Sequence, residues 1–146
     1  MIRTLLPATL LVTAIACGAP AETADTGAPA SAAERCILDY PSDTYGFGDG
    51  DPDAASLDCN AAGATDCDVA GFMSIEAARC VAEDAGLEAG LADWSFGIWF
   101  YTDEGAVAWS VSNTLTQDGP SSSGRSLRIH ATSGEVLSQL EWEAQP

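Results

Sequence analysis

Apolar residues recur at every second position in two runs within the C-terminal half of the chain. Residues 96–101 read Phe-Gly-Ile-Trp-Phe-Tyr, and residues 106–111 read Ala-Val-Ala-Trp-Ser-Val. A period of two residues is typical of a strand with one buried face. The Asp-Glu-Gly sequence at 103–105 supplies turn residues between the runs, so the two strands are expected to pair as an antiparallel hairpin.

Two more strands are expected after this hairpin. The polar, serine-rich segment 116–124 is expected to be a mobile, exposed loop. Residues 126–131 then resume the alternation, and Thr-Ser-Gly at 132–134 predicts a turn. A last strand is expected over residues 135–143, with an apolar face made of Val136, Leu140 and Trp142, of which Val136 is expected to enter the core.

Residues 74–86 have the longer period of an amphipathic helix. Ser74 is suited to cap its N-terminus, and Gly86 is suited to end it. The apolar stripe of this helix consists of Ile75, Ala78, Ala82 and Ala85, widened by Val81. The expected fold class is therefore α+β, with one helix packed on a four-stranded antiparallel sheet over residues 73–146.

Residues 36–72 show no sustained period of either kind. Gly, Pro, Asp and Ala dominate this segment, although it also contains aromatic residues. Such a composition interrupts regular elements. The segment is expected to be an acidic, irregular arm that disulfides hold in place ahead of the α+β domain.

The first 35 residues have the features of an export signal followed by a linker. Residues 1–16 combine Arg3 with a short apolar stretch, which is typical of a signal peptide. Thr-Ala-Ile-Ala-Cys at 13–17 resembles the lipobox of bacterial lipoproteins, which implies that Cys17 is lipidated. An ordinary signal peptidase site at Ala14 to Ala16 is the alternative. Residues 17–35 lack bulky apolar groups and are expected to form a flexible tether.

The lipobox resemblance also implies a location. The chain is expected to be exported and lipid-anchored to the cell envelope. The Gly18 that follows the lipidated cysteine favours the outer membrane over retention in the inner membrane.

The charge balance of the chain excludes two classes of partner. The sequence has 22 Asp and Glu against 5 Lys and Arg, a net charge of −17. Such a chain repels the phosphates of nucleic acids and anionic lipid heads. Nucleic acid is therefore not an expected partner, and membrane contact is expected through the lipid anchor alone. Acidity suits solubility, attraction of cations, or docking to a basic partner.

Four cysteines remain once Cys17 is set aside, namely Cys36, Cys59, Cys67 and Cys80. An even number in a small exported domain predicts two disulfides. Zinc is the competing interpretation, but no CxxC pair occurs. Cys80 falls on the polar side of its predicted helix, which suggests that the arm lies across that side. The favoured pairing is Cys36 with Cys80 and Cys59 with Cys67, although three pairings are possible.

Three blocks of residues 73–142 resemble a PepSY domain. They are Ser-Ile-Glu-Ala-Ala at 74–78, Val-Ala-Trp-Ser-Val at 107–111, and Ile-His-Ala-Thr-Ser-Gly-Glu-Val-Leu at 129–137. PepSY domains are thought to hold secreted peptidases inactive or to bind other proteins. The resemblance therefore implies a noncatalytic module whose partner is a secreted protein or peptidase.

Candidate site residues fall into two sets. Trp99 and Tyr101 lie on the side of their strand opposite the predicted core, so this side, or the segment near Asp118, is a candidate partner surface. The sequence Asp49-Gly50-Asp51-Pro52-Asp53 is like the start of a calcium loop, because hard cations need several oxygen ligands. Ala54 stands where an EF-hand needs Gly, so a solvated acidic loop is the alternative. A weak calcium site is the one cofactor considered.

Catalysis is not expected from these residues. His130 is the sole histidine and lies at the end of a predicted strand, and no Gly-x-Ser-x-Gly sequence surrounds the serines at 121–123. The sequence therefore predicts a membrane-tethered, noncatalytic protein-binding or peptidase-inhibitory lipoprotein. The alternative function is a structural or cation-binding acidic lipoprotein of the envelope.

Overall fold

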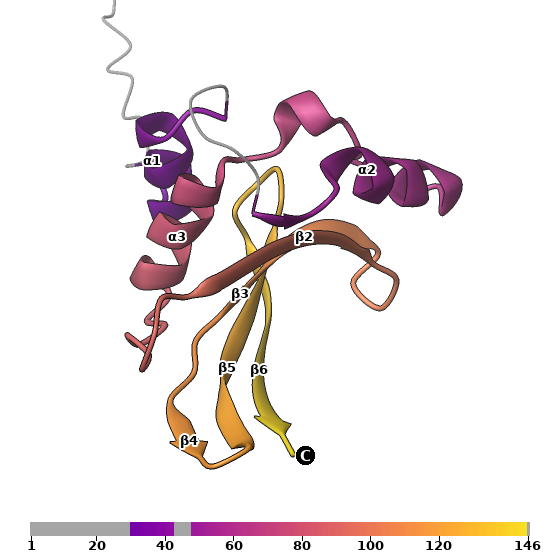
Figure 1. Ribbon diagram of the computed structural model, residues 1–146. Helices are drawn as coiled ribbons and strands as arrows, with labels where there is room; N and C mark the ends of the chain where they lie inside the picture. Colours follow the sequence, from indigo (N-terminus) through magenta and orange to yellow (C-terminus); the bar gives the residue numbers. More distant parts are fainter. Residues whose placement is uncertain (1–29, 43–47, 146) are drawn as a thin grey trace, which may run out of the picture.

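Three α-helices and a six-stranded sheet make up the described part of the chain in the computed structural model (Figure 1). The structure describes residues 30–42 and 48–145. The expected signal peptide, Cys17 and the tether as far as residue 29 lie outside these residues. The helices are α1 (Ala32–Asp39), α2 (Pro52–Ala61) and α3 (Ile75–Asp84), and a short 3-10 helix spans Val69–Gly71. The strands are β1 (Asp49–Gly50), β2 (Ser95–Tyr101), β3 (Ala106–Ser112), β4 (Thr116–Asp118), β5 (Ser121–His130) and β6 (Val136–Ala144).

The four long strands form the antiparallel arrangement that the alternating sequence predicts, paired in the order β2, β3, β5 and β6. Two short strands complete the sheet. β1 pairs in parallel with the free edge of β2, and β4 pairs with the first residues of β5. The sheet is thus six-stranded and mixed. The expectation of a purely antiparallel, four-stranded sheet is therefore wrong. The sequence does not reveal β1 and β4, because such short strands have no recognisable alternating pattern.

The predicted helix is present as α3, with the expected ends. Ser74 is its N-cap, and the Ser74 hydroxyl accepts a hydrogen bond from the N–H of Ala77 at 3.1 Å. The chain leaves the helix through Gly86, which has a φ of +83° and so adopts the left-handed conformation that glycine tolerates best. The buried side chains of α3 are Ala77, Ala78, Val81 and Ala82, so the face toward the sheet includes most of the predicted stripe.

The hydrophobic core lies between the helices and one face of the sheet. Ile98 and Trp109, on neighbouring strands, have 0% of their surface exposed. The indole N–H of Trp109 donates to the carbonyl of Met73 at 3.1 Å, which satisfies its polar group inside the core. Ala55 and Cys59 of α2 belong to the same core. α2 and α3 therefore cover the same face of the sheet.

Two disulfides tie the N-terminal segments to this core. Cys36 of α1 is bonded to Cys80 of α3, and Cys59 of α2 is bonded to Cys67. The favoured pairing from the sequence is thereby confirmed. α1 packs chiefly against α3, and the two helices lie side by side (Figure 1).

The prediction of a flexible tether reaching residue 35 is wrong for its last residues, because α1 begins at Ala32. Ser31 and Glu34 form a capping box: the Ser31 hydroxyl accepts from the N–H of Glu34 at 3.1 Å, and the Glu34 carboxylate accepts from the N–H of Ser31 at 2.7 Å. The two side chains satisfy two backbone donors that a helix start otherwise leaves unpaired.

The prediction of an irregular arm over residues 36–72 is also wrong. α2 occupies residues that the sequence pattern left without an element. Asp51 is its N-cap, with the carboxylate accepting from the N–H groups of Asp53 at 2.9 Å and Ala54 at 3.3 Å. Pro52 stands at the first helical position, where its missing N–H costs nothing. Residues that interrupt a helix elsewhere thus begin this one.

The expected mobile loop at 116–124 is instead a tight hairpin between β4 and β5. Gly119, with a φ of +58°, and Pro120 form its turn. Thr116 and Ser123 are partners across the ladder, and their hydroxyl groups are 2.6 Å apart. The polar serines lie in an extended strand because β5 is paired along both of its edges.

The last strand is present, but its apolar residues do not enter the core. Val136 is 40% exposed and Leu140 is 43% exposed. Leu140 is the antiparallel partner of Ser126, and such partners point to the same side of a sheet. Ser126 points away from the core, and Leu140 therefore does too. The expectation that Val136 enters the core is corrected, because β6 is an edge strand that the helices contact little.

Candidate functional site

The sheet has a second face, opposite α2 and α3, which we call the open face. Strand register assigns residues to it, because partners across a ladder share a side of the sheet. It carries Ser95, Gly97, Trp99 and Tyr101 from β2, Ala106, Ala108, Ser110 and Ser112 from β3, Gly124, Ser126, Arg128 and His130 from β5, and Ser138, Leu140 and Trp142 from β6. Trp99 is 48% exposed and Leu140 43%, so this face is not covered by a core of its own.

The indole of Trp99 reaches back along β2 because the residue two positions earlier is glycine. A Cβ placed on Gly97 would be 2.7 Å from Nε1 of Trp99 and 3.5 Å from Cε2. The edge of the indole that carries Nε1 thus lies over the bare backbone of Gly97, while the side chain stays 48% exposed.

A shallow cavity of about 190 Å³ lies beside this indole. Its wall includes Asp49, which shares a side of the sheet with its ladder partner Gly97. Serines provide further polar groups, and the hydroxyls of Ser112 and Ser95 are 3.4 Å apart. The cavity is lined by Asp49, Ser95, Phe96, Gly97, Trp99, Ser110 and Ser112. An aromatic residue, an acidic residue and several serines therefore border one cavity.

Tyr101 is on the same face as Trp99, but its ring is already covered. The guanidinium carbon of Arg128 lies 4.1 Å from the centre of the Tyr101 ring, within the range of a cation–π contact. Arg128 also pairs with Asp103 and, at 3.4 Å, with Glu104. The hydrogen bond from Arg128 lowers the pKa of Asp103, and the same bond raises the pKa of Arg128. Of the two aromatic residues predicted here, only Trp99 has no described arginine over its ring.

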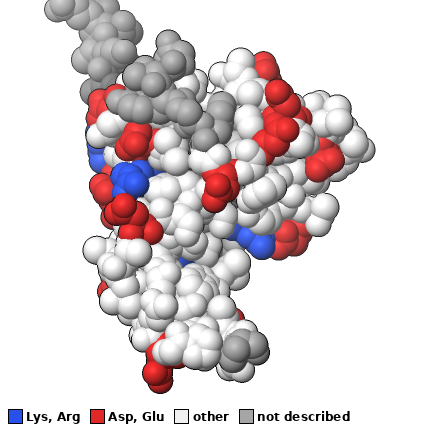
Figure 2. Space-filling view, in the orientation of Figure 1, with Lys and Arg blue, Asp and Glu red and all other residues white. Residues whose placement is uncertain are grey.

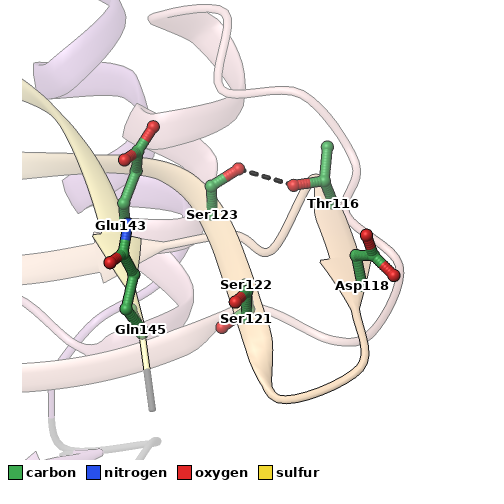
Figure 3. A pocket seen from close by; sticks show the side chains of 8 residues that line it. Thr116, Asp118, Ser121, Ser122, Ser123, Glu143 and Gln145 are labelled. Atoms are coloured by element: carbon green, nitrogen blue, oxygen red, sulfur yellow. Dashed lines mark hydrogen bonds between the residues drawn. The ribbon is translucent and has the colours of Figure 1, made fainter.

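Asp118, the third predicted surface residue, is not brought near Trp99. It ends β4 at the far end of the sheet, which extends beyond the helices (Figure 1). There it borders a separate cavity of about 230 Å³ with Thr116, Glu143 and the serines at 121–123 (Figure 3). Ser123 has the same parity along β5 as the core residue Leu127, so this cavity is on the helix side of the sheet. The predicted surface therefore divides into two regions.

The three aspartates of the predicted calcium loop have separate roles. Asp51 caps α2, Asp53 lies in the first turn of that helix, and Asp49 belongs to β1. Among the described residues, the one close group of potential metal ligands contains Cys36, Cys80 and Asp84 instead. Both of its sulfur atoms are in a disulfide. Carboxylates at a helix start interact favourably with the exposed N–H groups there, which is the role that Asp51 and Asp53 have in α2.

His130 stabilises a turn. Its Nδ1 atom accepts from the N–H groups of Thr132 at 3.3 Å and Ser133 at 3.2 Å. The turn continues into Gly134, which has a φ of +72° and lies so close to Ala33 of α1 that a Cβ would be 2.8 Å from the Cβ of Ala33. The histidine ring is thus occupied by the backbone beside it.

The arginines in the described ranges are all paired with acidic residues. Arg35 pairs with Asp84, Arg79 with Glu76, Arg125 with Glu141, and Arg128 with Asp103 and Glu104. Figure 2 shows basic atoms bordered by acidic ones, with further acidic patches standing apart. The negative charge of the chain is therefore left largely uncompensated on the surface.

Sequence reasoning missed part of this site. Gly97 carried a usable signal, because a glycine two residues before a tryptophan on one strand face leaves room for the indole. Asp49 was assigned to a metal loop, and its position beside Trp99 depends on the parallel pairing of β1, which the sequence pattern does not reveal.

Within residues 30–42 and 48–145, no helix has the length and apolar character needed to cross a membrane. Comparison with known proteins gives no relative from which a function could be transferred: no protein-family model, no curated protein and no solved structure matches this chain.

Proposed function

We propose that this chain is an exported lipoprotein, acylated at Cys17, whose α+β domain is a noncatalytic PepSY-like module that binds a secreted protein through the open face. The observation that carries the proposal is Trp99, a large apolar side chain on the open face of the sheet at 48% exposure. Aromatic anchors of this kind are enriched at the centres of protein interfaces. A secreted peptidase, held inactive by the module, is the partner class that the PepSY resemblance favours.

The two disulfides support the export part of the proposal. Such bonds persist in oxidising compartments beyond the inner membrane and are rare in the cytosol. Cys36–Cys80 and Cys59–Cys67 account for every cysteine other than Cys17. One cysteine is thus left for the lipid, at the position where the lipobox resemblance expects it.

Lipid attachment is tested by metabolic labelling with palmitate in cells that express the full chain. The wild-type protein is expected to carry label and to sediment with the outer membrane. Cys17→Ala is expected to lose the label and to move to the soluble fraction. Label that persists in Cys17→Ala, or an unlabelled wild-type protein, contradicts the anchor.

Partner binding is tested by cross-linking the full chain in intact cells and identifying stoichiometric adducts. Trp99→Ala is expected to abolish the adduct. Leu57→Ala is the matched control, because Leu57 is also an exposed apolar residue, at 72%, but lies on α2. Loss of the adduct in both variants, or no adduct with the wild type, contradicts binding through the open face. A peptidase partner is expected to regain activity when Trp99→Ala replaces the wild type.

An acidic structural or cation-binding lipoprotein is the second candidate, favoured by the unpaired acidic surface. Calorimetric titration of the full chain with calcium separates the two. Saturable heat that Asp49→Asn and Asp53→Asn remove, together with no protein adduct, supports the second candidate over the first.

A further inference from the structure

We infer that the cavity beside Trp99 receives a basic side chain of the partner, an arginine in the first place. This inference rests on the proposed binding function and specifies the chemistry of the partner. It is carried by the juxtaposition, in one cavity, of the exposed Trp99 indole with Asp49, the ladder partner of Gly97 on the neighbouring strand.

The chain already uses arginine against its own aromatic rings. Arg128 stacks on Tyr101 at 4.1 Å, and Arg79 lies 4.9 Å from the centre of Phe96. Each of these arginines is also paired with a carboxylate. Trp99 and Asp49 repeat the same combination of ring and carboxylate, but among the described residues no arginine joins them. Tryptophan is the ring that attracts a cation most strongly, so Trp99 is a stronger position for a cation than Tyr101 or Phe96, which already have one.

The polar groups of the cavity suit a guanidinium. Asp49 is exposed and has no basic partner among the described residues, so its carboxylate is available as an acceptor. The hydroxyl of Ser110, the ladder neighbour of Gly97, provides a second acceptor. A planar group stacked on the indole would present its N–H donors toward both.

The cavity is small and shallow. Its volume is about 190 Å³, whereas pockets for cofactors and drug-sized molecules range from roughly 300 to 1,000 Å³. It therefore matches the head of one side chain better than a nucleotide or a flavin. The ligand is therefore part of a larger partner whose remaining surface lies on the sheet around the cavity.

Charge complementarity favours a partner segment with positive charge. The chain has a net charge of −17, and its described arginines are already paired with acidic residues. An excess of one sign attracts an oppositely charged partner and accelerates its association. A basic segment is therefore favoured over a neutral glycan, which would use the indole face but gain nothing from Asp49 or from the field.

The test uses the full chain in detergent, labelled with nitrogen-15, and follows the four indole N–H signals by NMR. The Trp99 signal is identified by its loss in Trp99→Leu. The probes are Nα-acetyl-arginine amide and its neutral isostere Nα-acetyl-citrulline amide, at matched ionic strength. The arginine probe is expected to shift the Trp99 signal in a saturable manner, with smaller shifts at Trp94, Trp109 and Trp142. The citrulline probe is expected to leave it unchanged.

Two variants sharpen the result. Asp49→Asn is expected to lower the affinity for the arginine probe about two- to fivefold, as for loss of an exposed ion pair. Gly97→Ala is expected to displace the indole of Trp99 and to lower the affinity for the arginine probe about fivefold, as for loss of a cation–π contact. Leu57→Ala is the control, and its affinity for the probe is expected to equal that of the wild type.

Several outcomes overturn the inference. Equal shifts at all four indoles would show diffuse attraction to the acidic surface. Equal binding of the citrulline probe would show that charge is irrelevant. A shift of Trp99 by chitotriose but not by the arginine probe would assign the cavity to a glycan. If the cross-linked partner depends on Trp99 while the arginine probe does not bind, the binding function stands and the basic side chain is rejected. Probe binding without a partner rejects the function and leaves the cavity assigned.

Discussion

Arg128 organises the open face at the scale of single residues. Its side chain is 19% exposed and lies on the ring of Tyr101 while pairing with two carboxylates in the turn between β2 and β3. The long apolar stem of an arginine can cover neighbouring surface while its head remains paired. Arg128 thereby joins β5 to the β2–β3 turn and covers Tyr101, which leaves Trp99 as the open ring.

The pairing of Asp103 with Arg128 predicts a pH-dependent contribution to stability. Because the folded state lowers the pKa of Asp103, the contribution is present at pH values above the ordinary aspartate pKa and is lost as the pH falls through the lowered value. Asp103→Asn is therefore expected to lower Tm at pH 7, and the difference from the wild type is expected to vanish in strong acid. Thermal unfolding of both proteins across the acid range measures it. A difference that is independent of pH would assign the effect to packing.

The same substitution, glycine to alanine, is expected to reduce stability by very different amounts at two positions. A Cβ on Gly97 meets the end of the Trp99 side chain, which is free to swing outward, whereas a Cβ on Gly124 would overlap the backbone carbonyl of Asn113. Gly97→Ala is expected to cost less than about 1 kcal/mol, and Gly124→Ala about 3 kcal/mol or more. Urea denaturation of the two variants measures both. Equal costs would mean that Trp99 is fixed on the sheet.

At the scale of elements, the sequence predicts those helices and strands in which apolar residues recur at regular intervals. The helix at 74–86 and the four long strands have periodic apolar residues, and the structure has them at those places. The β4–β5 hairpin has no such pattern, because both of its faces are polar and its extended shape comes from pairing along both edges of β5. α2 buries only Ala55 and Cys59, and two small residues leave little periodic signal.

The sequence predicts the cap of one helix, Ser74, and a comparison of this residue with Ser31 gives a matched pair of predictions. The Ser74 hydroxyl caps α3 and donates to the carbonyl of Tyr40 at 2.9 Å from a buried position. Ser31 caps α1 at the surface. Ser74→Ala is expected to cost about 2 kcal/mol, and Ser31→Ala about 1 kcal/mol or less, because Ser74 is buried and its loss also removes the hydrogen bond to the Tyr40 carbonyl. Chemical denaturation compares them, and a larger cost for Ser31→Ala would contradict the assignment.

At the scale of the whole molecule, contacts between distant segments decide which predicted site residues meet. Alternation along β2 placed Trp99 on the open face, as the sequence predicts. Arg128 reaches Tyr101 from β5, and Asp49 reaches Trp99 through parallel pairing of β1. Asp118 is carried to the other end of the sheet by a hairpin. None of these three placements has a local signal, because each depends on the register of strands far apart in the chain.

The disulfides provide the last prediction, because they close loops of very different length. Cys36 and Cys80 are separated by 44 residues, and Cys59 and Cys67 by 8. The chain-entropy model gives about 4 kcal/mol for the first loop and about 2.5 kcal/mol for the second. The first bond also holds α1, which packs chiefly against α3 and has one exposed ion pair to it, between Arg35 and Asp84 at 3.9 Å. An exposed pair of this kind adds little. Replacing Cys36 and Cys80 together by alanine is therefore expected to cost more stability in urea than replacing Cys59 and Cys67, and to give rapid hydrogen exchange in α1 while β3 and β5 stay protected. Slow exchange in α1 without its disulfide would mean that packing, rather than the bond, holds the helix on the domain.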